Sequence, residues 1–213
     1  MNNQSATSRQ QALHIFFLRH GECEDAGMVR GITNSSLTEF GRKQMEQAVL
    51  GQSAWTDIVC SPLSRCLNFA RDIAGKEAVP LIIEPGFQEI DFGDWEGLSW
   101  QFLQREQPEA VQAYFENPLL NSTHSGEQYD KFLSRVLDAW CKLLPRLQGD
   151  RVLIVTHGGV IKSLLSSFLK IPMEAQTSLL VPHGCLSHLL LHTSDARQHV
   201  FLQSHNSANM GVK

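Results

Sequence analysis

An arginine and a histidine stand side by side at Arg19-His20, directly after an apolar run typical of a buried strand. Histidine can act as a nucleophile, and the planar guanidinium of arginine suits phosphate oxygens. A second histidine, His157, follows another apolar run at 151–156 and precedes two glycines. A strand that leads through His-Gly-Gly into a helix presents backbone N–H groups, that of Gly158 among them, to an anion. The two strings predict an anion site that contains a reactive histidine.

A third string follows the apolar run at 57–60. Ser61-Pro62 predicts the start of a helix, with Arg65 in its first turn. At 100° per residue, Arg65 lies about 200° from Leu63, away from the apolar face of that helix. Parallel strands end on the same side of a sheet, so both arginines and both histidines should share one crevice. Together they would form a cage for a dianion.

Each string also has a simpler interpretation. Arg65 alone fits a solvated surface arginine, and His157 alone fits an incidental polar residue at a tight glycine turn. The acidic run after residue 88 contains Glu89, whose apolar neighbours favour a protonated carboxyl group and therefore a general acid. Solvated loop carboxylates are the alternative there. The coincidence of three strand ends favours the functional interpretation.

The elements that must position these residues alternate between short apolar runs and longer helical periods. This pattern predicts an α/β fold: a three-layer sandwich with a mostly parallel central sheet, helices on both faces and the active site at the carboxyl ends of the strands. Strands are expected at 13–18, 57–60, 80–83 (an edge strand), 151–156, 185–191 and 199–203, and helices at 37–50, 62–74 and 160–168. A capping box at Ser125–Gln128 predicts one more long helix, which Pro145 ends or kinks.

The length of 213 residues suits one full-sized domain. We expect loose tails at 1–11 and 206–213 and a single domain at 12–205, with an irregular, lid-like insertion at about 86–125. Trp95 and Trp100 in this insertion could stack on a planar base of a substrate or belong to the core. Specificity is expected to come from this segment.

Composition narrows the classes of partner. A net charge of −4 argues against nucleic acid and anionic membranes. Five cysteines without paired spacing indicate reduced thiols in the cytoplasm. No stretch reaches the roughly 18 apolar residues of a membrane span, and the polar opening segment does not resemble a signal peptide. No cluster has metal-ligand spacing, so we expect neither a metal nor a cofactor.

Taken together, these strings resemble the histidine phosphatase superfamily. The matching segments, in the order of the family, are Leu18–Glu22, Leu37–Gly41, Ser61–Arg65, Glu89–Gly97, Ser125–Glu127 and Thr156–Gly159. The resemblance implies that His20 becomes phosphohistidine and that Glu89 protonates the leaving group. It also implies that Arg19, Arg65 and His157 bind the phosphate. The expected function is a metal-independent phosphomonoesterase for a small-molecule phosphate ester; a phosphoglycerate mutase-type phosphoryl transferase and a non-catalytic phospholigand-binding protein are the alternatives.

Within the superfamily, the compact length and the stretch 91–100 look most like α-ribazole phosphatases of cobalamin biosynthesis, which suggests α-ribazole 5′-phosphate as substrate. Two positions depart from the pattern of the family. Ala26 stands where members often carry an asparagine, so that phosphate contact is missing or comes from Thr33 or Asn34. Phe69 replaces a common threonine and indicates core packing. The sequence leaves open whether the chain forms a homodimer.

Overall fold

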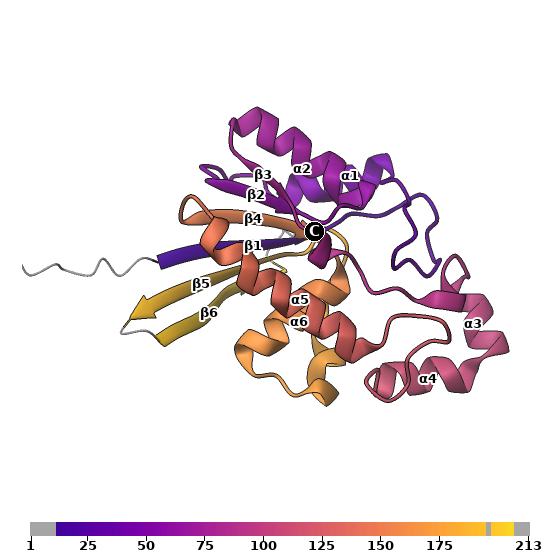
Figure 1. Cartoon of the computed structure of the whole chain (residues 1–213). Helices are drawn as coiled ribbons and strands as arrows, with labels where there is room; N and C mark the ends of the chain where they lie inside the picture. Colours follow the sequence, from indigo (N-terminus) through magenta and orange to yellow (C-terminus); the bar gives the residue numbers. More distant parts are fainter. Residues whose placement is uncertain (1–11, 195–196, 207–213) are drawn as a thin grey trace, which may run out of the picture.

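The computed structural model describes residues 12–194 and 197–206, and within them six strands form one sheet in the order β3-β2-β4-β1-β5-β6 (Figure 1). The strands are β1 (Ala12–Arg19), β2 (Asp57–Cys60), β3 (Leu81–Ile83), β4 (Arg151–Thr156), β5 (Leu186–Ser194) and β6 (Arg197–His205). β1 to β4 pair in parallel, whereas β5 and β6 run antiparallel at one edge. The predicted mostly parallel sheet is confirmed, with β3 as its other edge.

Helices cover both faces of the sheet (Figure 1). α1 (Glu39–Ala48) and α2 (Ser64–Glu77) pack on one face, and α5 (Tyr129–Leu143) and α6 (Gly158–Leu169) on the other. α3 (Trp100–Glu106) and α4 (Pro108–Glu116) lie beyond the carboxyl ends of β1 and β4, within the predicted insertion. Single turns of 3-10 helix occur at η1 (Pro85–Phe87), η2 (Gly93–Trp95) and η3 (Leu144–Arg146), and a longer one at η4 (Met173–Ser178). The three predicted layers are present.

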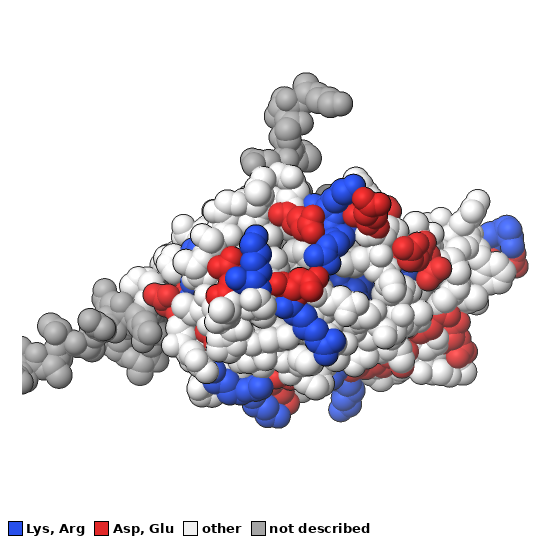
Figure 2. Space-filling model, turned by 90° about the horizontal axis from the view of Figure 1, so that it is seen from above, with Lys and Arg blue, Asp and Glu red and all other residues white. Residues whose placement is uncertain are grey.

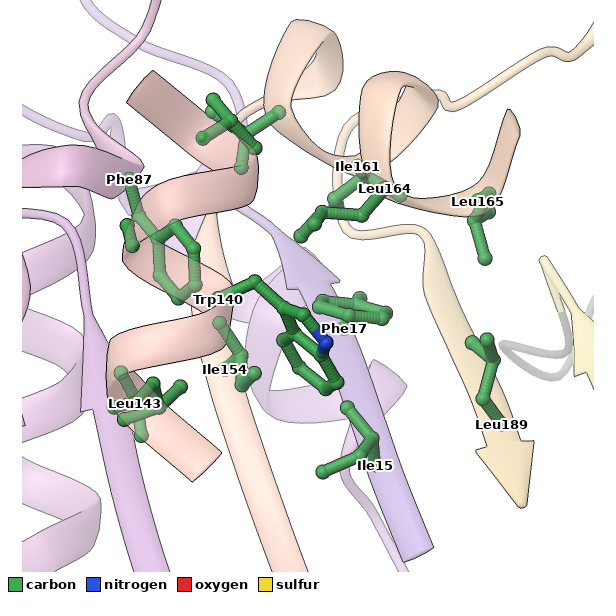
Figure 3. Close-up of a cluster of buried hydrophobic side chains, with 14 of the residues drawn as sticks. Ile15, Phe17, Phe87, Trp140, Leu143, Ile154, Ile161, Leu164, Leu165 and Leu189 are labelled. Carbon is green, nitrogen blue, oxygen red and sulfur yellow. The ribbon is translucent and has the colours of Figure 1, made fainter. Parts of the chain in front are cut away.

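Strand β1 is buried on both faces because apolar side chains occupy both of its alternating sides. Ile15 and Phe17 join the cluster under α5 and α6, which Figure 3 shows around Trp140. Phe16 and Leu18 join the cluster under α1 and α2. A slip of one residue would exchange these two sets of side chains, so packing on both faces specifies the register of β1. The position of His20, directly after the strand, is specified with it.

The boundaries predicted for α2 are wrong at both ends. The helix begins at Ser64, because Ser61 instead accepts the N–H of Leu63 at 3.3 Å and leaves these residues outside the helix. At the other end the helix continues through Gly75 to Glu77. It stops at Ala78, which has a φ of 55°. A glycine in the sequence was therefore not the signal that ends this helix.

The predicted capping box at 125–128 does not form. Ser125 has a φ of 58°, and α5 begins only at Tyr129, with no side-chain cap. The carboxylate of Glu127 binds Arg135, one of whose Nη atoms lies 2.7 Å away. Gln128, the last residue of the predicted box, is instead the N-cap residue of α5, and its neighbour Glu127 has a tertiary partner.

Acidic and basic side chains lie interleaved on the face that carries α1 and α2 (Figure 2). Arg42 pairs with Glu46 and Asp72, at 2.9 and 2.8 Å. Exposed pairs of this kind contribute at most about 1 kcal/mol each, so they do not determine the fold.

No helix among the described residues is both long and apolar enough to cross a bilayer. The predicted N-terminal tail, and all but Asn206 of the predicted C-terminal tail, lie outside the described residues.

Candidate active site

Three strands bring their carboxyl ends to one edge of the sheet. β1 and β2 both pair in parallel with β4, which lies between them. The N–H of His20 extends one ladder to the carbonyl of Thr156 at 2.9 Å, and the N–H of Ser61 extends the other to the carbonyl of Val155 at 3.0 Å. His157 directly follows β4. The three predicted strings therefore meet as the parallel topology requires.

His20 is oriented by its own backbone. Its Nδ1 lies 2.8 Å from the carbonyl oxygen of Gly21, which can only accept, so Nδ1 carries the proton and Nε2 keeps a lone pair. Burial, followed by the charges of Arg65 and Arg19, lowers the pKa of His20 well below its usual value. The imidazole is therefore neutral at neutral pH, which is the nucleophilic form.

Two glycines fix the loop that follows His20. A Cβ on Gly21 would lie 1.9 Å from the carbonyl oxygen of Gly41, and a Cβ on Gly41 would lie 2.0 Å from that of Glu22. Gly41 belongs to the first turn of α1, where its N–H donates to the side chain of the N-cap Thr38 at 2.8 Å. Two of the sequence strings are thus in direct contact, at a distance that only glycine permits.

Arg65 and His157 form a buried pair beside His20. Nε of Arg65 donates to Nδ1 of His157 at 3.2 Å, and Nε2 of His157, which then carries the proton, donates to the hydroxyl of Ser61 at 2.7 Å. The rings of His157 and His20 lie 5.3 Å apart between their centres. Burial and then the charge of Arg65 lower the pKa of His157 well below its usual value. Both rings are neutral beside a fixed cation.

Arg65 is 1% exposed, although its place on the helix is away from the apolar face. The carbonyl groups of Gly31 and Thr33 accept from its Nη atoms at 2.6 and 2.7 Å, so a loop from elsewhere in the sequence covers it. The alternative of a solvated surface arginine is therefore wrong. Burial of a cation with these acceptors is consistent with a structural or catalytic role.

A cavity of about 790 Å³ opens in front of His20. Arg19, Glu89 and Gly158 line it together with His20, whereas Arg65 and His157 do not and lie behind this wall. Nη1 of Arg19 donates to the carbonyl of Val181 at 2.5 Å, and its buried Nε has no partner among the described residues. The structure thus brings all five predicted catalytic residues together, in two layers. Direct contact of Arg65 and His157 with a phosphate stays a prediction.

Glu89 also lies on the cavity wall. Its Oε2 accepts the N–H of Gly159 at 2.9 Å, and its Oε1 accepts that of Ile90 at 3.1 Å. Of its apolar sequence neighbours, Phe87 packs into the core, whereas Ile90 and Phe92 line the cavity together with Glu89. A protonated carboxyl group in this setting stays a prediction. The first turn of α6 positions the carboxylate.

Arg135 in α5 anchors the segment that carries Glu89. Its Nη1 donates to the carbonyls of Gly86 and Gln88, both at 3.0 Å. The carboxylate of Glu127 accepts from two nitrogens of the same guanidinium, at 2.9 and 2.7 Å. Sequence reasoning did not identify Arg135, because its partners lie 8 to 49 positions away and no spacing indicates them.

The chain matches the model of the histidine phosphatase superfamily (branch 1) over residues 15–203. It belongs to this superfamily. A metal-independent phosphoserine phosphatase of Arabidopsis thaliana is 31% identical over 161 residues, which are 72% of this chain and 68% of the relative. An adenosylcobalamin/alpha-ribazole phosphatase of Salmonella typhimurium is 30% identical over 179 residues, 82% of this chain and 89% of the relative. The alpha-ribazole phosphatase structure from Shigella flexneri superimposes with a TM-score of 0.79 at 26% identity, over 94% of this chain and 100% of that one.

Membership confirms the resemblance, the fold and the phosphatase class that the motifs predicted. The predicted phosphate ligand Asn34 does not line the cavity of this histidine phosphatase, and its Oδ1 accepts the N–H of Ser64 at 2.8 Å in the first turn of α2. Thr33, the other candidate for the contact missing at Ala26, does not line the cavity either. As for Arg65 and His157, contact of Asn34 with a phosphate stays a prediction.

Three further basic residues of the cavity wall carry no motif that sequence reasoning could use: Arg30, Lys162 and His183. The ring of His183 lies 5.4 Å from that of His20. Burial and the charge of Arg19 lower the pKa of His183 to about 4, so this ring is neutral at neutral pH as well. Trp95, in contrast, is core: it is 5% exposed, and only Trp100 of the two tryptophans reaches the cavity.

The buried neutral histidines of this phosphatase predict loss of stability in acid. Below about pH 6.5, His20 and His157 bind protons in the unfolded chain but stay neutral in the folded one, because their pKa values are lowered by folding. The free energy of unfolding should therefore fall by about 1.4 kcal/mol for each ring per unit decrease in pH. Urea unfolding at pH 7.5, 6.5 and 5.5 measures this slope above the range in which most carboxylates titrate. His20→Asn should reduce the slope; an unchanged slope would contradict the assignment.

Proposed function

We propose that the protein is a phosphomonoesterase that hydrolyses a small-molecule phosphate ester through a phosphohistidine on His20, with α-ribazole 5′-phosphate as the substrate. The observation that carries the proposal is the neutral imidazole of His20, whose Nε2 keeps its lone pair beside two guanidinium groups. Arg19 on the cavity wall and Arg65 behind it supply positive charge where a phosphoryl group would lose its ester oxygen. We propose no metal in this chemistry.

The reaction proceeds in two displacements. Nε2 of His20 attacks phosphorus, the P–O bond to the alcohol breaks, and Glu89 gives its proton to the departing oxygen. A water molecule then attacks the phosphorus of the phosphohistidine, and the Glu89 carboxylate takes a proton from this water. The P–N bond breaks, inorganic phosphate leaves, and His20 returns to its neutral form. His157 holds the guanidinium of Arg65 in place through both steps.

The shape of the cavity supports a bulky substrate with a planar group. Its apolar wall includes Met28, Phe92, Trp100, Tyr114, Phe115 and Pro118. Aromatic side chains of this kind stack on planar rings such as benzimidazole. A volume of about 790 Å³ is larger than phosphoserine or a phosphoglycerate requires. These features favour α-ribazole 5′-phosphate.

A substrate panel tests the proposal. In the presence of a chelator, kcat/KM for α-ribazole 5′-phosphate should exceed that for O-phosphoserine and 3-phosphoglycerate. Trp100→Ala should lower kcat/KM for α-ribazole 5′-phosphate by about tenfold and change that for O-phosphoserine little, because only the former stacks. An equal effect on both esters would contradict stacking on Trp100.

Two outcomes would replace the proposed function. Rapid isomerisation of 3-phosphoglycerate with a bisphosphate primer would indicate a mutase, and binding of phosphate esters without turnover would indicate a non-catalytic protein.

The partner that we propose is a small-molecule ester, with neither nucleic acid nor a membrane involved. We propose the cytoplasm as its location, where the five cysteines, all free, would stay reduced.

A further inference from the structure

Glu96 accepts hydrogen bonds from four backbone N–H groups. Its Oε1 accepts from Gly31 at 2.9 Å and from Ile32 and Phe92 at 3.0 Å. Its Oε2 accepts from the N–H of Thr33 at 3.1 Å and also from the hydroxyl of Thr33. Hydrogen bonds to a carboxylate are stronger than those between neutral groups, so this residue holds two separate segments of chain firmly together.

The loop that Glu96 holds is the same loop that holds Arg65. The N–H groups of Gly31 and Thr33 face the carboxylate, while their carbonyl groups accept from the guanidinium. The peptide group that joins Gly31 to Ile32 lies between the two charges, because its N–H donates to Glu96 and its carbonyl accepts from Arg65. Each charged group therefore polarises this peptide group and strengthens the hydrogen bond on the other side. Arg65 has no salt bridge with a carboxylate among the described residues. Glu96 therefore acts on Arg65 through this loop, whose carbonyl groups hold the guanidinium.

Close packing of Gly31 supports this arrangement independently. A Cβ on Gly31 would lie 1.8 Å from the carbonyl oxygen of Ile90 and 2.3 Å from Oε1 of Glu96. The loop is therefore pressed against the segment that carries Glu89, one residue before Ile90. Only a glycine permits this approach. Phe92, the fourth backbone donor to Glu96, belongs to the same segment.

We propose that Glu96 is a positioning residue of this active site, which fixes Arg65 through the carbonyl groups of residues 31–33 and ties that loop to the segment of Glu89. Glu96 does not line the cavity, so it is not itself a proton donor to substrate. The inference rests on the proposed function for the role of Arg65 in binding phosphate. Whether Glu96 acts through Arg65 does not depend on that function, because the coupling between the two residues can be measured in phosphate binding without turnover.

The test uses Glu96→Gln in the full chain, with inorganic phosphate as the probe in calorimetry and p-nitrophenyl phosphate as the substrate. Gln keeps one acceptor oxygen but presents an NH₂ group to either set of donors. We expect phosphate binding to weaken about tenfold and kcat/KM to fall by about 10- to 100-fold, because the fork of Arg65 shifts. Glu96→Ala should have a larger effect on both.

A mutant cycle with Arg65→Lys separates positioning from general stability. Lysine cannot bind both carbonyls as the guanidinium does, so in that background Glu96→Gln should weaken phosphate binding by less than about twofold. If the two effects multiply instead, Glu96 does not act through Arg65 and the inference is overturned. A conservative Glu96→Asp variant should restore part of the phosphate affinity that Glu96→Ala loses.

Asp57→Asn is the matched control. Asp57 is a fully buried carboxylate that accepts the N–H groups of Gln148 and Gly149 at 3.1 Å, at the opposite, amino end of β2. The Asp57→Asn variant should have a lower melting temperature than wild type, as Glu96→Gln does, but an unchanged affinity for phosphate. Equal phosphate affinity in Glu96→Gln and wild type would overturn the inference. A wild type that binds phosphate without turnover, with binding weakened by Glu96→Gln, would overturn the proposed function alone.

Discussion

Replacement of His20 by alanine is expected to lower kcat/KM for every phosphate ester by about 10⁴-fold or more. The wild-type enzyme should carry a phosphoryl label that is labile in acid and stable in base, as a P–N bond is. His20→Ala cannot form that bond, because the nitrogen with the free lone pair is gone. Quenched-flow labelling with a phosphate donor, followed by acid and base treatment, measures the intermediate.

The phosphate site should survive this substitution. Arg19 stays on the cavity wall, and the pair of Arg65 and His157 keeps its own contacts. His20→Ala is therefore expected to bind inorganic phosphate within about tenfold of wild type. His199→Ala, which removes an exposed histidine of β6, serves as the control and should retain full turnover. Ordinary turnover by His20→Ala would refute covalent catalysis at this residue.

The sequence could predict the site residues that directly follow a strand, because apolar runs indicate where the strands end. The run at 13–18 is apolar on both sides, which indicates a strand buried on both faces, and the run at 151–156 does the same. Because parallel strands end together, Arg19-His20 and His157 had to meet. The short run at 57–60 then adds Arg65 from the following helix. Period and topology suffice for this much.

What sequence could not predict depends on contacts between loops. Arg65 is buried because residues 31–33 cover it, and the order of that loop depends on Glu96, more than sixty positions later. The Oδ1 atom of Asn34 accepts the N–H of Ser64, which lies 30 positions later in the chain. No periodicity indicates such pairs. A carboxylate within a glycine-rich stretch is the only local signal that could have pointed to Glu96.

The setting of Glu89 also depends on how an irregular segment folds. Of its apolar sequence neighbours, Phe87 turns into the core under α5, whereas Ile90 and Phe92 line the same cavity as Glu89. No periodicity in such a segment indicates which side chains share a face. The role of Glu89 must therefore be judged from what it can reach, which is the N-terminal turn of α6 and the space in front of His20.

Replacement of Glu89 by glutamine should separate the two displacements of the reaction. Gln can still accept the N–H of Gly159, so the local fold should persist, but it has no proton to give. For an alkyl phosphate, kcat should fall by about 10²- to 10⁴-fold, the usual contribution of a general acid or base. For p-nitrophenyl phosphate, formation of phosphohistidine should be far less affected, because nitrophenolate leaves without a proton.

The same variant should then accumulate the intermediate, because Glu89 is also the base that activates water in the second displacement. Rapid mixing of Glu89→Gln with p-nitrophenyl phosphate should give a burst of nitrophenolate close to one equivalent per enzyme, followed by slow turnover. The label on His20 should rise in parallel with the burst. Gln88→Ala, which keeps the backbone carbonyl that binds Arg135, is the control and should show wild-type turnover. An equal loss of rate for alkyl and nitrophenyl esters, without a burst, would remove Glu89 from proton transfer and leave it a purely structural contact of α6.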